Sequence, residues 1–435
     1  MIPFNNLSKH INIVIGKGLI PTHIIINFKN TIFYFLPSII SLFINIYTTP
    51  IFTKILSHAD YAIIGYFGSI QSFLLPILNL SLFPFYMKEF HVKNKHENDE
   101  ILTSITLFLT FINLGTIGIA TFFVFIYFKI TDVIFPFSPY IFFALFASYF
   151  SIYISLLKMK YKMQKKARNF ALLSLSFTIT NIIFGLILVV VYQLGAKGNM
   201  GAMLLAQGLI GILSFFILVK DRVINFTIIR NALSLGYPII IASLLELPIL
   251  YIDRILLERQ NNVVELGLYN IGMIFSGYLL IMNSSIFQAF EPDLFRFIQK
   301  KDYKKLKITV LILFGTMFLC NIIYTIFSKN IISLLTGNKY TAAYHYSNVF
   351  IWSDFLLQIS YFLIIFFIVQ NKTNKLLFQK IILACISLII FPLAISKWNF
   401  NGAAFSRIII SFISCLIFLY FLIISKQNNK NKSII

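Results

Sequence analysis

Twelve apolar stretches, each long enough to cross a lipid bilayer, divide this chain of 435 residues. A helix needs about 20 mostly apolar residues to span the hydrocarbon core. The candidate spans are residues 32–52, 62–86, 101–128, 135–157, 170–192, 200–219, 236–257, 267–290, 308–327, 344–369, 376–395 and 402–424. The sequence therefore predicts an all-α integral membrane protein with about 12 transmembrane helices.

The basic residues are distributed unevenly between these spans. Most of the 36 lysines and arginines lie in the N-terminal segment, in the even-numbered gaps and in the C-terminal tail. Short loops rich in Lys and Arg stay on the cytoplasmic side of a membrane. Both termini of this multi-pass membrane protein are therefore expected in the cytoplasm.

Composition narrows the classes of function. Hydrophobic residues make up 58% of the chain and charged residues only 12%, so its main solvent is a bilayer. The net charge of +21 resides mainly in short juxtamembrane gaps, where anionic headgroups attract it. Membrane lipids are therefore the expected partners, and nucleic acid is not. The cysteines and histidines lack metal-ligand spacing, and we expect neither a metal nor a cofactor.

The order of spans and gaps indicates a duplication. Six spans, a basic gap and six more spans give two halves of the same orientation. Lys54 follows Pro-Ile-Phe-Thr at the end of the first span, and Arg254 takes the corresponding place in the seventh. The predicted units are a cytoplasmic lead at 1–30 (an interfacial helix or a less ordered lead-in), a six-helix bundle at 31–220, a basic linker at 221–235, a second bundle at 236–425 and a basic tail at 426–435.

Two prolines occur in each of the first and seventh spans. They are Pro37 and Pro50 in the first, and Pro238 and Pro248 in the seventh. Proline removes a backbone hydrogen bond and kinks a helix. Interrupted helices at matching places in two halves point to the central site of a transporter. These four prolines are the predicted kinks, although proline is also common in membrane helices that have no such role.

Two carboxylates lie inside the seventh span. A charged side chain at the bilayer centre costs about 2.5–3.5 kcal/mol and needs a partner or a wet cavity. Glu246 and Asp253 are seven residues apart, which places them on nearly the same helix face. We interpret them as candidates for binding a coupling cation or for balancing charge.

Four further charged residues are candidates for binding substrate in a cavity between the halves. Arg407 lies in the twelfth span, Asp354 in the tenth, and Arg254 and Lys54 at matching places in the two halves. An arginine fork pairs bidentately with phosphate oxygens, which suits an anionic substrate. The alternative is that these charges form internal salt bridges, or that those near the interface snorkel to the headgroups.

Several motifs carry a resemblance to a known family. They are Thr49-Pro-Ile-Phe-Thr-Lys-Ile-Leu-Ser57 with Tyr61 and Gly65-Tyr66, then Gly236-Tyr-Pro238, Asp253-Arg-Ile-Leu256 and Gly267-Leu-Tyr269, and finally Leu334-Leu-Thr-Gly337 with Tyr340. In this order they resemble the polysaccharide transport family. That family is the Wzx-type O-antigen flippase branch of the multidrug/oligosaccharidyl-lipid/polysaccharide exporter superfamily. The chain departs from the pattern at Ala62, where the family usually has glycine.

The resemblance implies a fold and a function. It implies the MATE/flippase-like fold, in which two six-helix bundles enclose a V-shaped cavity. The implied function is not enzymatic: the protein flips an undecaprenyl-pyrophosphate-linked oligosaccharide, such as an O-antigen repeat unit, across the inner membrane by alternating access. Cationic cavity residues would hold the pyrophosphate, and polysaccharide polymerase or assembly proteins would act as partners in lipopolysaccharide biosynthesis.

Two alternatives remain open at this stage. A drug or cation antiporter of the same superfamily would share the twelve spans, but the first span, residues 32–52, holds no Asp or Glu. An integral-membrane polysaccharide polymerase or ligase would also be basic and polytopic. Such enzymes typically carry a large external loop, whereas the external gaps of this chain are short.

Overall fold

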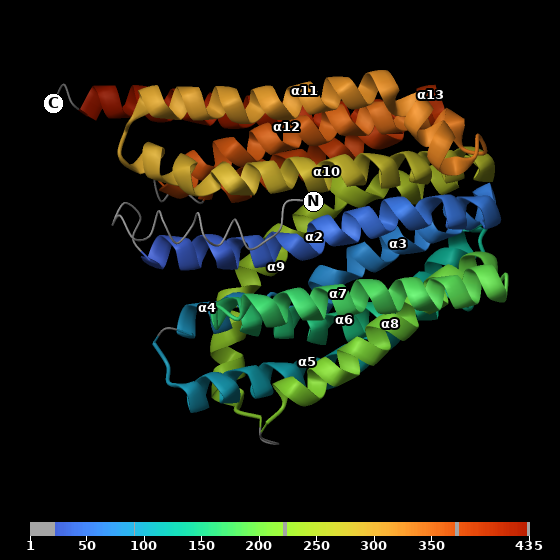
Figure 1. The fold of residues 1–435 in the computed structure, drawn as a ribbon, viewed down its shortest axis with the longest axis horizontal. Coiled ribbons are helices and arrows are strands. Elements are labelled where there is room, and N and C mark those ends of the chain that lie inside the picture. The colour runs from blue at the N-terminus through green and yellow to red at the C-terminus, as the bar shows by residue number, and fades with distance from the viewer. Residues whose placement is uncertain (1–21, 91, 221–223, 370–373, 433–435) are drawn as a thin grey trace, which may run out of the picture.

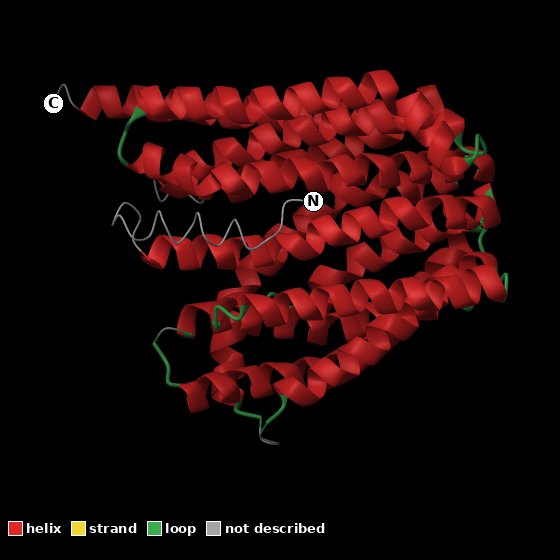
Figure 2. Ribbon diagram, in the orientation of Figure 1, coloured by secondary structure: helices red, strands yellow, loops and turns green. Residues whose placement is uncertain are grey.

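The structure is a computed structural model that describes residues 22–90, 92–220, 224–369 and 374–432. Over this part of the chain every regular element is helical (Figure 2). The elements are α2 (Thr22–Ile55), α3 (His58–Asn79), α4 (Phe83–Glu89), α5 (Lys95–Thr131), α6 (Tyr140–Met163), α7 (Ala167–Gly185), the π-helical turn η1 (Leu186–Val191), α8 (Gly195–Leu218), α9 (Phe226–Glu258), α10 (Val263–Gln299), α11 (Tyr303–Thr336), the 3-10 turn η2 (Thr341–Ala343), α12 (Tyr344–Val369) and α13 (Asn374–Lys432).

The described helices account for the predicted number of spans. Ten of them are long and apolar enough to cross a membrane, and α9 adds an eleventh when its two segments are taken as one span. The long helix α13 is broken at Asn399, where φ is 47° and ψ is −130°. Its two arms lie side by side: Gln379 on the arm before the break donates a hydrogen bond of 2.8 Å to Ser414 on the arm after it. Since α13 therefore crosses twice, the twelve predicted spans are present.

The helices form two bundles of six spans, as predicted (Figure 1). In the first bundle α6 packs against α8, and α7 packs against α2 and α8. In the second, α12 packs against α10 and α13, and α13 packs against α9. The proposed domain boundaries stay a prediction. Residues 1–21 of the expected lead lie outside the described residues, whereas residues 22–30 belong to α2.

Helix α9 starts inside the segment that the sequence predicted to be a linker. It begins at Phe226 and bends by 44° between Phe226–Tyr237 and Ile239–Glu258. The bend falls at Pro238, one of the four predicted kinks. Pro37 and Pro50 lie within α2, and Pro248 lies within the second segment of α9. Among the four predicted kinks, Pro238 is thus the one at which the structure breaks a span by more than 40°.

Alternate connections emerge at opposite ends of the molecule (Figure 1). The loops after α2, α5, η1, α9 and α11 and the break at Asn399 lie at one end, which we call the cation-poor end. The connections after α4, α6, α8, α10 and α12 lie at the other, the cation-rich end. This arrangement matches the alternation of basic and non-basic gaps in the sequence.

The two bundles meet closely where α3 crosses α10, near the cation-poor end. A Cβ atom added to Gly65 would lie 2.0 Å from Cγ of Asn270, so any larger residue there would have to displace the Asn270 side chain. The Asn270 amide donates a hydrogen bond of 3.3 Å to the carbonyl of Tyr61. One turn away, a Cβ on Gly267 would lie 2.3 Å from the carbonyl oxygen of His58.

Loop contacts extend this closure to the cation-poor surface. Lys339 Nζ donates to the carbonyl oxygens of Leu56 (2.5 Å) and Thr53 (3.3 Å). The Tyr340 hydroxyl also donates to Leu56, at 2.5 Å. The last carbonyls of a helix lack partners within it and carry partial negative charge, which suits a lysine. On the other side, Glu258 of α9 accepts a hydrogen bond of 2.7 Å from the Ile134 amide.

These cross-bundle contacts relate the two halves by an approximate repeat. The contacts of Lys339 and Tyr340 with the end of α2, and of Ile134 with the end of α9, each pair one bundle's first helix with the segment after the other bundle's third long helix. Ser57 and Asn262 both cap the second helix of their bundle, and each is followed three residues later by an acid, Asp60 or Glu265. Gly65 and Asn270 each lie five residues after that acid. The crossing of α3 with α10 therefore joins equivalent positions. We refer to all these cross-bundle contacts together as the end seal.

A matched pair of glycine substitutions tests the hairpin of α13. A Cβ on Gly402 would lie 2.1 Å from the carbonyl oxygen of Ala394, whereas a Cβ on Gly315 of α11 meets nothing within 4 Å. In a helix, alanine is preferred to glycine by about 0.5–1 kcal/mol. Gly402→Ala should lower the midpoint of thermal unfolding in detergent, and Gly315→Ala should leave it unchanged or raise it. Equal effects of the two variants would contradict this geometry.

Candidate functional site

A buried ion pair joins the first and last spans of the second bundle. Arg407 of α13 lies with Nε 2.8 Å from Oδ2 of Asp253 on α9, and their side chains are 12% and 0% exposed. The Tyr269 hydroxyl donates a second hydrogen bond of 2.5 Å to the same carboxylate oxygen. Arg407 Nη2 also donates to the carbonyl oxygen of Leu250 at 2.8 Å. The pair therefore holds α9, α10 and α13 in one register.

Arg254, the next residue along α9, has donors to spare. Its Nη1 is 3.5 Å from the carbonyl oxygen of Gly65 in the other bundle, at the limit of a hydrogen bond. Its Nε is buried without a partner among the described residues, as is Oδ1 of Asp253. The guanidinium carbon lies 6.0 Å from the ring centroid of Tyr251. Because Asp253 is already paired with Arg407, Arg254 is the less neutralised of the two arginines.

Asp354 stands near this network without joining it. Its neighbour Ser353 on α12 lies 2.9 Å from Ser411, one turn beyond Arg407 on α13, measured between the hydroxyl oxygens. Asp354 itself is half-buried and forms no ion pair or hydrogen bond with the described residues. The structure thus brings three of the predicted candidates (Asp253, Arg254 and Arg407) into one cluster on the second bundle, with Asp354 on the adjoining helix.

Glu246 lies apart from the cluster of Asp253, Arg254 and Arg407, nearer the cation-rich end. Its Oε2 is 3.0 Å from Nζ of Lys380 on α13, and the two side chains are 37% and 28% exposed respectively. Glu246 also lines a cavity of about 470 Å³ between the bundles. Residues of α3, α4 and α6 form the cavity wall on the first bundle, and residues of α9 form the wall on the second. We call this space the inter-bundle cavity.

The inter-bundle cavity mixes polar and apolar groups. Its polar lining includes Ser72, Asn79, Ser243 and Tyr251 in addition to Glu246. Oδ1 of Asn79 is buried without a partner among the described residues. Tyr251 lies both in the cavity wall and beside Arg254, so it connects the cavity to the charged cluster. The cavity lies on the cation-rich side of the end seal, since Asn79 ends α3 there.

The remaining candidate, Lys54, is not part of either group. It lies at the exposed C-terminal end of α2 and forms no ion pair or hydrogen bond with the described residues. The matching motif position is thus occupied differently in the two halves: Arg254 faces the other bundle at the end seal, whereas Lys54 is exposed at the surface. The alternative interpretation, an interfacial charge, describes its position better.

Sequence reasoning missed two partners that the structure supplies. Tyr269 bonds to Asp253, and Lys380 pairs with Glu246. Tyr269 was visible as the tyrosine of the Gly267-Leu-Tyr269 motif, without an assigned role. A second buried cluster was also missed: Asp99 of α5 lies 3.1 Å from Lys160 and 2.6 Å from Lys220. That cluster fastens the chain after α8 to the first bundle.

No family model matches the chain. An inward-facing multidrug resistance MATE family transporter of the MOP superfamily superposes with a TM-score of 0.65 at 13% identity, covering 92% of this chain and 96% of that one. The lipid II flippase MurJ in an inward closed conformation also gives 0.65, at 15% identity over 90% and 87%. The fold is that of MOP-superfamily transporters.

One curated protein is similar over nearly the whole chain. It is "Lsg locus putative protein 1" of Haemophilus influenzae, 20% identical over 405 residues, which are 91% of this chain and 97% of that protein. The likeness to these structures confirms the predicted fold, and the candidate spans make the chain a multi-pass membrane protein. In the described ranges no group of three or more His, Cys, Asp or Glu side chains is placed to hold a metal ion.

Separate and combined substitutions of the buried pair test its structural role. Removing one partner of a buried ion pair leaves an uncompensated charge and costs about 3–5 kcal/mol. Asp253→Asn and Arg407→Gln should therefore each lower the thermal midpoint and the membrane abundance, and the double variant should recover part of the loss. The exposed pair Lys93–Glu97 is the control, since Lys93→Gln should change the stability by at most about 1 kcal/mol. Full additivity of the two single changes would argue against a coupled pair.

Proposed function

We propose that this protein is a flippase that moves an undecaprenyl-pyrophosphate-linked oligosaccharide, such as an O-antigen repeat unit, across the inner membrane by alternating access. The observation that carries the proposal is the cavity of about 470 Å³ between two bundles, bounded on one side by the end seal. A transporter needs such a space, accessible from one side at a time. The two-bundle fold supports the same conclusion, because alternating access generally proceeds by rocking one bundle against the other around a central site.

The proposed orientation places the cation-rich end in the cytoplasm, by the positive-inside rule. The conformation described here then has its cavity on the cytoplasmic side and its seal on the opposite side. This is the state that loads substrate from the cytoplasmic leaflet. The MurJ neighbour is described as a lipid II flippase in an inward closed conformation. Lipid II is the substrate of MurJ, and its lipid-linked chemistry supports the substrate class proposed here.

Arg254 is the residue best placed to meet the pyrophosphate. Its Nε has no partner among the described residues and its Nη1 has only a long contact to Gly65. A guanidinium fork pairs bidentately with phosphate oxygens. Arg407 adds positive charge near Arg254, although Asp253 balances much of the charge of Arg407. The serine, asparagine and tyrosine side chains of the cavity would hydrogen-bond sugar hydroxyls.

Glu246, Asp253 and Asp354 take charge-balancing roles in this proposal. Glu246 is held by Lys380, and Asp253 by Arg407, so neither is free to bind a coupling cation in this conformation. Asp354 forms no ion pair or hydrogen bond with the described residues, and it stays a candidate for contact with substrate or cation. On the opposite face of the membrane, a polysaccharide polymerase or assembly proteins would receive the flipped repeat units.

The antiporter alternative is favoured by one observation, the fold shared with a multidrug resistance MATE transporter. Against it, the span Leu36–Ile55 of α2 contains no acidic residue that a cation could neutralise. The polymerase alternative would need a reaction centre in an external domain, and the described loops at the cation-poor end are short.

The experiment that tests the flippase proposal follows the substrate between leaflets. Cells lacking the protein are used to prepare inverted and right-side-out vesicles, and the accessibility of lipid-linked oligosaccharide to a membrane-impermeant reagent is compared. The proposal predicts that completed repeat units stay on the cytoplasmic leaflet. Single repeat units that reach the outer leaflet but are not polymerised would favour the polymerase. An unaltered distribution with increased drug sensitivity would favour the antiporter.

A disulfide across the end seal tests alternating access directly. The three cysteines, Cys320, Cys385 and Cys415, are first replaced by alanine. Gly65→Cys combined with Asn270→Cys should then form a disulfide, because the second change removes the amide that a Cβ on Gly65 would meet at 2.0 Å and leaves the two Cβ atoms close together. Oxidation should reduce transport to background by preventing the seal from opening, and reduction should restore it.

The matched control for this cross-link joins two helices of the same bundle. The hydroxyl oxygens of Ser360 on α12 and Ser414 on α13 lie 2.9 Å apart, and cysteine sulfurs would take their places. A disulfide between cysteines at these positions should leave transport unchanged, because both helices move together. Full transport with the Gly65–Asn270 pair oxidised would contradict opening at the cation-poor end.

A further inference from the structure

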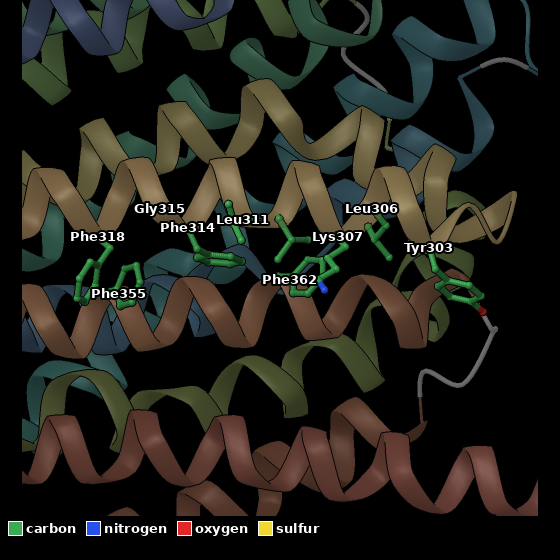
Figure 3. Close-up of a pocket in the computed structure, with 10 residues that line it drawn as sticks. Tyr303, Leu306, Lys307, Leu311, Phe314, Gly315, Phe318, Phe355 and Phe362 are labelled. Atoms are coloured by element: carbon green, nitrogen blue, oxygen red, sulfur yellow. The ribbon is translucent and has the colours of Figure 1, made fainter.

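We propose that the second bundle carries a binding site for one anionic phospholipid of the surrounding membrane, in a groove between α11 and α12. The groove has a volume of about 630 Å³ and runs along α11 from Tyr303 to Phe318 (Figure 3). No residue of the first bundle lines it, and it shares no residue with the inter-bundle cavity. The site is therefore separate from the proposed transport route.

The groove wall suits a hydrocarbon chain. Four phenylalanine rings line it, Phe314 and Phe318 from α11 and Phe355 and Phe362 from α12. Gly315 lies between the two rings of α11 in the sequence, and a Cβ added there would meet nothing within 4 Å. The missing side chain leaves room for a chain to lie against the helix. The neighbouring surface is also apolar, with Leu311 69% exposed and Leu319 58% exposed.

The groove length agrees with one lipid chain. The sixteen residues from Tyr303 to Phe318 are joined by fifteen helical steps, which rise by about 22 Å. Half of the hydrocarbon core is about 15 Å thick, and the headgroup region adds several ångströms more. A chain that starts beside Tyr303 at the cation-rich end would therefore reach past Phe314 toward the middle of the bilayer.

The rim of the groove carries positive charge, which decides the headgroup. Lys307 lines the groove, and Lys300, Lys301 and Lys304 lie exposed within one or two turns of it. None of these four lysines has a carboxylate partner among the described residues, whereas Lys305 is paired with Asp302. Each juxtamembrane lysine attracts an anionic headgroup by about 1 kcal/mol. A phosphate without a compensating choline or similar cation is the favoured headgroup.

The occupant is a membrane lipid because of where the groove opens. Its walls belong to two of the helices that are apolar enough to span a membrane, so it faces hydrocarbon along most of its length. A soluble anion could reach the lysines but would leave the aromatic wall uncovered. A lipid covers both at once. This combination of an apolar groove and an unpaired basic rim carries the proposal.

Native mass spectrometry of the purified full chain tests the site, with phosphatidylglycerol and phosphatidylcholine as probes. Phosphatidylglycerol should bind preferentially to the unmodified protein. Lys304→Gln combined with Lys307→Gln should weaken this binding about 30-fold, since two charges are removed. Gly315→Phe, which fills the groove, should weaken binding of phosphatidylglycerol without removing any charge.

Control variants separate this site from the general lipid surface. Gly118→Phe on α5 also places a ring where an added Cβ meets nothing within 4 Å, and Lys165→Gln with Lys166→Gln removes two exposed lysines elsewhere on the cation-rich end. Both should bind phosphatidylglycerol like the unmodified protein. Equal losses in the control variants, or unchanged binding in Gly315→Phe, would overturn the proposal. Displacement of phosphatidylglycerol by glycerol phosphate alone, or preferential binding of undecaprenyl phosphate, would also overturn the phospholipid assignment.

Discussion

The close contact of Gly65 with Asn270 controls how near the two bundles can come to each other. A side chain on Gly65 would collide with the Asn270 amide, so a larger residue fits at this tight crossing only if that amide moves or is replaced. The contacts nearer the cation-poor surface depend on this close crossing. Lys339 and Tyr340 can donate to the carbonyl of Leu56, just after α2, only while α3 and α10 lie close together. With the end seal closed, the inter-bundle cavity lies only on its cation-rich side. Alternating access requires that these contacts break together.

The buried pair of Asp253 and Arg407 has a different role. It lies within the second bundle and fixes the register of α9 against α13, with Tyr269 of α10 bound to the same carboxylate. A charge inside a membrane is tolerated when it has a partner, and this arrangement supplies one for Asp253 and for Arg407. Arg254 is left with unused donors at the interface between the bundles. The structure therefore separates a positioning pair from an arginine that is available to an anionic group.

Sequence alone predicted the parts of this architecture that depend on one helix at a time. Span length, the alternation of basic gaps and the bend at Pro238 follow from local hydrophobicity and from the chemistry of proline. Pairing between helices could not be predicted in the same way. Asp253 and Arg407 are 154 residues apart, and Glu246 and Lys380 are 134 apart. Both carboxylates were candidates for one shared cavity, yet each has its own partner. Lys54 matched Arg254 by motif, but it lies one residue before the end of α2 at the surface, whereas Arg254 lies a full turn before the end of α9.

The central claim is that the cation-poor end opens while the cation-rich end closes. Distances between spin labels, measured by pulsed electron paramagnetic resonance in lipid nanodiscs, test it most directly. One pair would replace exposed Lys197 and Asn338 at the cation-poor end, and the other Lys165 and Lys301 at the cation-rich end. On addition of lipid-linked oligosaccharide, the account predicts a new population with a longer distance in the first pair and a shorter one in the second. Distances that stay fixed, or that lengthen at both ends together, would contradict it.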